Sequence, residues 1–287
     1  MRQITEQAPN MAISLDTQAG HELLHDQLAS DPRDAIVVSD FDHTLCHEYV
    51  FDPETNNKTP IVDPELARAF GRLPCMVVTG RRANNPHVGI IWSEGLLPPD
   101  IPLIAENGGV ILESNGEIRS AVASTDEVDF IDEQIKALAR DSLQLPAGFS
   151  LITKPGETLV VVRAQLADGS SRRDVHDFIT PAIQTAVGEE WIVVDCGTTL
   201  NVQKRSVSKR TAVEQSGLQR SNYQVVSLGD SPNDIDLLDE ADVAIAVGNK
   251  IAEHADFVVA SNPASVTTVL QTIGRAVIAR RQFRDYP

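Results

Sequence analysis

The strongest constraint on the fold is a series of short apolar runs, each closed by a polar turn. The first run is AIVVSD at 35–40, and the form returns in LPCMVVTG at 73–80 and IPLIAENGG at 101–109. Runs of this length that are rich in β-branched residues are typical of buried parallel strands. Three more runs follow later in the chain: YQVVSLGD at 223–230, ADVAIAVG at 241–248 and ADFVVASN at 255–262. Helical patterns such as DPELARAFGRL lie between several of them, and this alternation predicts an α/β fold with a parallel sheet.

The middle of the chain, about residues 110–205, has a different pattern. GVILESNGEIRSAV predicts a hairpin with an Asn-Gly turn, and FSLITKPGETLVVVRAQL and WIVVDCGTTLNVQK predict further antiparallel strands. FIDEQIKALARDSL and SRRDVHDFITPAIQTAV are typical of helices. We therefore predict an inserted α+β module. The expected domains are an N-terminal extension at 1–34, a core made of 35–110 and 205–287, and the insert at 111–204.

The charge balance of the chain limits its partners. The 287 residues carry a formal charge of -17, so the basic face of a nucleic-acid binder or of an electrostatic membrane binder is not expected. No apolar run approaches a membrane span, and the N-terminal residues lack the apolar core of a signal peptide. The three cysteines are far apart in sequence, which is typical of reduced thiols. We expect a cytoplasmic protein whose partner is a small molecule, and we leave the oligomeric state open.

Two aspartates, Asp40 and Asp42, follow the first buried run directly. Carboxylates beside an apolar core are costly unless something positive lies near them. Paired carboxylates favour Mg²⁺, and a carboxylate is also a competent nucleophile toward a phosphoryl group. Phosphoryl transfer needs little beyond positioning and charge neutralisation. Because parallel strands bring their carboxyl ends to one edge of the sheet, we expect the other groups of such a site at other strand ends.

Suitable groups follow the other runs. In VVTGRR, the Thr79 hydroxyl and the Gly80 amide end a run and can hold phosphoryl oxygens. In SVSKRTAV, Lys209 begins a helical pattern, where its ammonium and the helix dipole both favour an anion. SLGDSPNDIDLL supplies Asp230, Asn233 and Asp234. Mg²⁺ together with Lys209 would stabilise the buried carboxylates.

These four segments resemble, in order, the four motifs of the haloacid dehalogenase superfamily of phosphatases: DFDHTL, VVTGRR, VSKRTAV and GDSPNDIDLL. IAENGGVI and an insert between the second and third motifs resemble the C2-capped (type IIB) branch. That branch includes trehalose-6-phosphate, sucrose-phosphate and Cof-like phosphatases and phosphomannomutase. The resemblance covers about residues 35–265. It implies a Rossmann-like parallel sheet core with an inserted α+β cap of the C2 type.

The resemblance also implies roles for individual residues. Asp40 would be the nucleophile, and Asp42 would protonate the leaving oxygen and then activate water. The implied phosphate ligands are Thr79, Gly80, Lys209 and Asn233, and the implied Mg²⁺ ligands are Asp40, Asp42, Asp230 and Asp234. The implied substrate is a phosphorylated sugar or sugar-like polyol selected by the cap. Candidate substrate contacts are Arg82, Asn84, Glu106, Asn107, Lys154 and Arg163.

The chain departs from the family pattern in two places. His43 replaces the usual glycine before Thr44, and Arg210 replaces the glycine that often follows the motif lysine. If the first position needs a positive φ, histidine is among the less penalised residues, so we expect an intact turn. The segment at 46–62 predicts an unusually long flap beside the site, which could gate it.

Other functions fit parts of the sequence. A phosphomutase would use the same groups but pass the phosphoryl group to a second sugar hydroxyl, and a sugar-phosphate binder would need neither nucleophile nor acid. HELLH at 21–25 matches the H-E-x-x-H pattern of zinc hydrolases. It lies ahead of the core without the longer extension of that pattern, so the alternative is an exposed helix packed through Leu23 and Leu24. Lys204 competes with Lys209 as the motif lysine.

Overall fold

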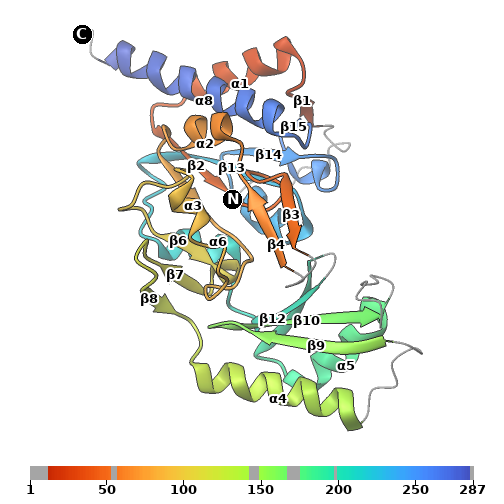
Figure 1. Ribbon diagram of the computed structural model, residues 1–287. Helices are drawn as coiled ribbons and strands as arrows, with labels where there is room; N and C mark the ends of the chain where they lie inside the picture. Colours follow the sequence, from red (N-terminus) through yellow and green to blue (C-terminus); the bar gives the residue numbers. More distant parts are fainter. Residues whose placement is uncertain (1–11, 53–56, 142–148, 167–174, 197–198, 285–287) are drawn as a thin grey trace. The chain divides into compact units, whose positions relative to one another are not determined.

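The computed structural model describes residues 12–52, 57–141, 149–196 except 167–174, and 199–284 (Figure 1). The chain divides into two compact units, each described by itself below. Unit 1 is Met1–Val77, Ser93–Pro98 and Gln219–Pro287, and unit 2 is Val78–Trp92 and Pro99–Leu218. The domain boundaries given above, at 34/35, 110/111 and 204/205, stay predictions.

Unit 1 is built on a six-stranded sheet in which every neighbouring pair of strands is parallel. In spatial order the strands are β1 (Ile13–Ser14), β15 (Phe257–Val259), β14 (Val243–Val247), β13 (Tyr223–Gly229), β2 (Asp34–Ser39) and β5 (Cys75–Val77). The predicted parallel α/β sheet is therefore confirmed for five of the six apolar runs. The edge strand β1 comes from the N-terminal segment, where no strand was expected, because two residues without an apolar run give no periodic signal.

Helices α1 (Gln18–Ser30), α2 (Pro64–Phe70) and α8 (Pro263–Arg284) of unit 1 pack together, with α8 against both of the others (Figure 1). Thr17 caps α1 by accepting from the Gly20 amide, and Asp63 caps α2. Leu24 of α1 is fully buried, as predicted, but Leu23 is 51% exposed. The prediction that Leu23 packs on the core is wrong because the next residue along a helix points about 100° away.

The other elements of unit 1 follow the central strands along the chain. β3 (Glu48–Asp52) and β4 (Asn57–Ile61) form an antiparallel hairpin within the expected flap. η3 (Pro232–Asp234) leads into α7 (Ile235–Asp239), and η4 (Ala252–His254) precedes β15. Among the described helices, none combines the length and the hydropathy that crossing a bilayer requires.

Unit 2 contains a three-stranded antiparallel sheet of β6 (Leu103–Ala105), β7 (Val110–Leu112) and β8 (Ile118–Ala121). The β7–β8 hairpin turns at Asn115-Gly116 as predicted, with Gly116 at φ 85°. The run at 101–109 was expected to join the parallel sheet, and that prediction is wrong. β6 turns back through η1 (Glu106–Gly108) to pair with β7, and only an isolated parallel bridge joins Ile104 to Val78.

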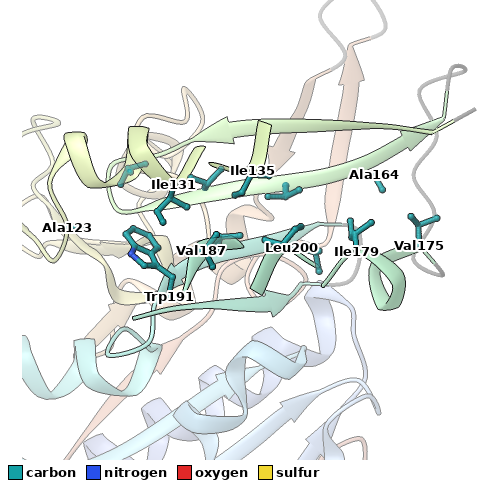
Figure 2. Close-up of a cluster of buried hydrophobic side chains, with 14 residues drawn as sticks. Ala123, Ile131, Ile135, Ala164, Val175, Ile179, Val187, Trp191 and Leu200 are labelled. Atoms are coloured by element: carbon teal, nitrogen blue, oxygen red, sulfur yellow. The ribbon is translucent and has the colours of Figure 1, made fainter. Parts of the chain in front are cut away.

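The predicted α+β module is confirmed in unit 2. Its sheet has the order β11 (Trp191–Asp195), β12 (Leu200–Lys204), β10 (Leu159–Leu166) and β9 (Phe149–Pro155), and all its pairs are antiparallel. Helices α4 (Thr125–Asp141) and α5 (His176–Val187) pack on this sheet. Figure 2 shows the apolar side chains between the helices and the sheet, among them Ile131, Ile179 and Leu200. The opposite face of the sheet carries both polar and apolar residues, among them Lys154, Arg163 and Val161.

We predict that the core in Figure 2 limits the stability of unit 2. Ile179 on α5 is fully buried, so Ile179→Ala should lower the free energy of unfolding by about 2–5 kcal/mol through lost apolar contact and a residual cavity. The neighbouring Phe178 is 52% exposed, so Phe178→Ala is the matched control and should cost much less. Urea denaturation followed by circular dichroism measures both. Equal losses in the two variants would contradict the assignment of this core.

Candidate active site

The two acidic segments of the sequence lie side by side in unit 1. β2 pairs in parallel with β13, with Ser39 opposite Leu228. The Asp40 amide continues this pairing by donating to the Leu228 carbonyl at 3.0 Å. Asp40 and Asp230 therefore directly follow the carboxyl ends of neighbouring central strands, which is where ligands bind in open parallel sheets.

Three buried carboxylates meet at this edge. Asp40, Asp230 and Asp234 are 5%, 3% and 0% exposed, and one oxygen from each lies within 4.8 Å of the others. Burial and the nearby Asp234 raise the pKa of Asp230, while Lys250 acts in the opposite direction from 3.2 Å. Because so much negative charge is costly out of water, the donor set fits a hard divalent cation that prefers carboxylate oxygens. Asp40, Asp230 and Asp234 would hold that cation.

Asp234 also has a structural task that its motif position did not reveal. Its Oδ2 accepts from the Asp230 and Ser231 amides, each at 3.1 Å, and from the Ser231 hydroxyl at 3.0 Å. A Cβ on Gly229 would lie 2.4 Å from the Asp234 Cβ, so only glycine allows this approach. The carboxylate thus fixes the turn that carries Asp230. Asn233 belongs to the same turn, and its Oδ1 lies 2.6 Å from the Ser231 hydroxyl oxygen, as an alternative acceptor of the one hydroxyl proton.

The turn after Asp40 carries Asp42, which is partly buried. His43 adopts φ 60°, and the Leu45 and Cys46 amides both donate to the Phe41 carbonyl at 2.9 Å. The expected intact turn is confirmed, since histidine takes the left-handed conformation here.

The flap supplies a residue that the sequence alone did not single out. The Tyr49 hydroxyl, on β3, donates to Asp42 Oδ1 at 2.7 Å. Cys46 Sγ lies 3.3 Å from the carbonyl oxygens of Glu48, the first residue of β3, and of Ile61, the last residue of β4. Burial, with a smaller contribution from His43, lowers the pKa of His47 to about 4, so this ring is neutral at pH 7. The base of the flap is thereby joined to the turn that carries Asp42.

The predicted phosphate-binding residues Thr79, Gly80 and Lys209 belong to unit 2. Thr79 is fully buried, its amide donates to the Ile104 carbonyl at 2.8 Å, and its hydroxyl oxygen accepts from the Arg81 amide at 3.1 Å. A Cβ on Gly80 would lie 2.8 Å from Asn107 Oδ1, so a larger residue here would have to displace the Asn107 side chain.

Lys209 is the buried lysine of the two candidates. It is the first residue of α6 (Lys209–Gln215) and is 1% exposed. Ser208 caps this helix, and Thr211 completes a reciprocal capping box. Lys204 instead donates to Glu127 Oε1 at 2.6 Å on the surface of unit 2. The burial of Lys209 favours it as the motif lysine.

Glu106, a candidate substrate contact, is engaged within the protein. Its carboxylate accepts from the amides of Ala83, Glu157 and Thr158 and from the Thr158 hydroxyl, at 2.6–3.1 Å. Glu106 and Asn107 both have positive φ, at 55° and 56°. Glu106 therefore ties the loop after Thr79 to the β9–β10 turn, and its observed role is structural.

The remaining candidate substrate contacts divide into two groups. Asn107 donates to Gln203 Oε1 at 2.8 Å and Arg82 to the Pro155 carbonyl at 3.0 Å, while Asn84 is exposed on its loop. Lys154 and Arg163 stand on β9 and β10 at positions opposite Val161 and Ile152. Val160 and Val162 face the helices, so Lys154 and Arg163 lie on the other, open face of this sheet.

The HELLH segment does not form a metal site in the described structure. His21 Nδ1 lies 3.0 Å from the Thr272 hydroxyl of α8, and His25 Nδ1 lies 3.3 Å from Asp26 Oδ1. Among the described residues, the three-ligand cluster found is that of Asp40, Asp230 and Asp234, and it includes neither histidine. Packing of α1 on α8 accounts for the segment, and the zinc hydrolase reading has no support.

We predict that Asp230 destabilises the metal-free protein. A raised pKa means that the native state binds this proton more tightly than the unfolded chain does. The free energy of unfolding therefore falls as the pH rises through the Asp230 pKa. Asp230→Asn should therefore raise the thermal midpoint in EDTA at pH 7 and abolish the increase that Mg²⁺ gives the wild type. Calorimetry measures both, and Asp236→Asn, in the same segment, is the control. A lower midpoint for Asp230→Asn in EDTA would refute this account.

We also predict that both carboxylate oxygens of Glu106 contribute to the stability of the fold. Glu106→Gln places an NH₂ group against backbone N–H donors, so the free energy of unfolding should fall by about 1–3 kcal/mol. Glu117 is exposed, and Glu117→Gln should change the free energy by less than about 0.5 kcal/mol. Urea denaturation compares the two. Equal stability of Glu106→Gln and wild type would show that the carboxylate contacts contribute little.

Comparisons with known proteins support the family resemblance and the fold. Residues 169–270 match the haloacid dehalogenase-like hydrolase family. A phosphoglycolate phosphatase from Sulfurisphaera tokodaii is 25% identical over 223 residues, which cover 76% of this chain and 83% of that protein.

Two solved structures share the fold. The C-terminal domain of trehalose-6-phosphate phosphatase from C. albicans matches with a TM-score of 0.60 and 17% identity, covering 93% of this chain and 98% of that one. A phosphatase of the haloalkanoate (HAD) superfamily from Bacteroides thetaiotaomicron matches with a TM-score of 0.58 and 16% identity, covering 85% and 97%. The family model, the curated relative and these two folds support the resemblance of the chain to the haloacid dehalogenase-like hydrolases.

Proposed function

We propose that this hydrolase is a Mg²⁺-dependent phosphatase that cleaves a small-molecule phosphomonoester through an aspartyl-phosphate on Asp40. The observation that carries the proposal is the buried cluster of Asp40, Asp230 and Asp234, with Asp42 two residues from Asp40. A site of three buried carboxylates at this edge of the sheet suits a cation and a phosphoryl group together. The phosphatases among the similar proteins support the reaction class.

The reaction would proceed in two steps. In the first, an Asp40 oxygen attacks phosphorus and the bond from phosphorus to the leaving oxygen breaks, while Asp42 donates its proton to that oxygen. In the second, the Asp42 carboxylate takes a proton from water as the water oxygen attacks phosphorus and the bond to Asp40 breaks. Inorganic phosphate leaves, and both aspartates return to their starting states. Bound Mg²⁺ would neutralise the negative charge of the phosphoryl oxygens and of Asp40.

We infer that Thr79, Gly80 and Lys209 bind the phosphoryl group, as the resemblance implies. Thr79 lies two residues beyond β5 along the chain, and β5 is the neighbour of β2 in the sheet. Lys209 is a buried cation at the start of a capped helix, which suits it to hold an anion. Asn233 would support the same site from the turn after Asp230.

The proposed substrate is a phosphorylated sugar or cyclitol. One solved structure of similar fold is a trehalose-6-phosphate phosphatase, which supports this class. The phosphoglycolate phosphatase relative adds a short phosphorylated acid to the substrates worth testing. Lys154 and Arg163 lie on the open face of the unit 2 sheet, where they are suited to contact hydroxyl or acidic groups of a substrate. They are the proposed cap contacts.

The test of this function is phosphate release from a panel of phosphomonoesters, with Mg²⁺ and with EDTA. The panel includes trehalose 6-phosphate, sucrose 6-phosphate, glucose 6-phosphate, mannose 1-phosphate, a cyclitol phosphate and phosphoglycolate. Asp40→Asn should lower turnover by more than about a thousandfold, because the nucleophile is lost. Asp236 has no role in the proposed chemistry, so Asp236→Asn is the control and should retain wild-type turnover.

Two results would contradict the proposal. Substantial turnover by Asp40→Asn would exclude Asp40 as the nucleophile. Transfer of phosphate to a second sugar hydroxyl, without release to water, would make the enzyme a phosphomutase instead. Rapid-quench labelling of Asp40 by a good substrate separates a phosphatase or a phosphomutase, which both form a phosphoenzyme, from a protein that only binds the substrate and forms none.

A further inference from the structure

The hydroxyl of Tyr49, in the flap, contacts one carboxyl oxygen of Asp42, the acid of the proposed reaction. We propose that Tyr49 is a positioning residue for Asp42: its hydroxyl holds Oδ1 so that Oδ2 carries the proton that goes to the leaving oxygen. This inference rests on the proposed function, in which Asp42 is the acid. It assigns a role in the reaction to a residue outside the four motifs.

The contact itself is short. Tyr49 Oη lies 2.7 Å from Asp42 Oδ1 and 3.4 Å from the Cys46 carbonyl oxygen. A phenol has one proton to donate, and the shorter contact is the one expected for a hydroxyl that donates to a carboxyl oxygen. Asp42 Oδ1 is therefore the acceptor of this hydrogen bond.

Several contacts hold the Tyr49 ring in place. Tyr49 pairs with Pro60 across the β3–β4 hairpin. Its ring centroid lies 5.5 Å from that of His43, with the two rings tilted by 59°. His43 is the residue that replaces the family's usual glycine, and its amide donates to the Cys46 carbonyl at 2.6 Å. The unusual residue in the motif and the flap tyrosine thus form one packed unit.

The consequence for catalysis follows from the two oxygens of a carboxyl group. When Oδ1 accepts from Tyr49, the proton of neutral Asp42 resides on Oδ2. Tyr49 keeps its own proton throughout, so no additional proton is transferred. The hydroxyl would thereby fix both the rotamer of Asp42 and the oxygen from which the acid acts. This matters when the leaving group is an alkoxide, which needs a proton, and much less for a dinitrophenolate, which leaves without one.

The test therefore compares two esters in the first reaction step. Wild type, Tyr49→Phe and Tyr223→Phe are mixed rapidly with the best alkyl phosphate of the panel above and with 2,4-dinitrophenyl phosphate, and phosphoenzyme formation is timed. The first step is timed because Asp42 acts in both steps. Tyr49→Phe should slow the alkyl ester about tenfold, a part of the full effect of a general acid, and the dinitrophenyl ester less than about twofold. Tyr223→Phe, the control outside the flap, should match wild type on both.

Equal slowing of both esters by Tyr49→Phe would show a general structural effect and overturn the positioning role. So would unchanged rates on both esters. Failure of the proposed function gives a different result, since wild type would then form no phosphoenzyme from either ester, and the inference would fall with it. Tyr49→Phe keeps the ring that packs on His43, so loss of the fold does not confuse the comparison.

Discussion

Repulsion among buried carboxylates is the constraint on which the rest of unit 1 depends. Asp40, Asp230 and Asp234 lie close together at the ends of β2 and β13, where water cannot screen their charge. The backbone pairing of the two strands and the hydrogen bonds around Asp234 keep them together despite that cost. The Mg²⁺ ion of the proposed function would offset that repulsion.

Unit 2 contains a buried carboxylate that hydrogen bonds stabilise, as they do Asp234 in unit 1. Glu106 is as buried as the aspartates, yet backbone amides and a hydroxyl surround its oxygens. That carboxylate needs no cation, and it joins the loop after Thr79 to the β9–β10 turn. Burial of an acidic side chain therefore does not by itself mark chemistry. The three aspartates differ from Glu106 in lying together, within 4.8 Å of one another.

The flap contacts the residue at which the first motif departs from the family pattern, His43. His43 tolerates the positive φ that its position requires, and its ring also packs against Tyr49. Tyr49 in turn reaches Asp42, and Cys46 joins both flap strands at their base. The length of this flap was evident from the sequence. Its contact with Asp42 depends on how the hairpin folds back, which no periodic pattern encodes.

Local patterns were sufficient for most elements and for the acidic motifs. β-Branched runs predicted the parallel strands, and Asn115-Gly116 predicted its hairpin. The acidic motifs predicted that Asp40, Asp230 and Asp234 meet, as they do, while their chemistry stays a prediction. The strand at 103–105 was misassigned because an isolated apolar run does not reveal its partner. Tertiary structure alone decided that Glu106 is structural, that Lys209 rather than Lys204 is buried, and that Tyr49 meets Asp42. The physical reason is that hydrophobic periodicity reports which side of an element is buried, whereas hydrogen-bond partners far apart in sequence are set only when the elements pack.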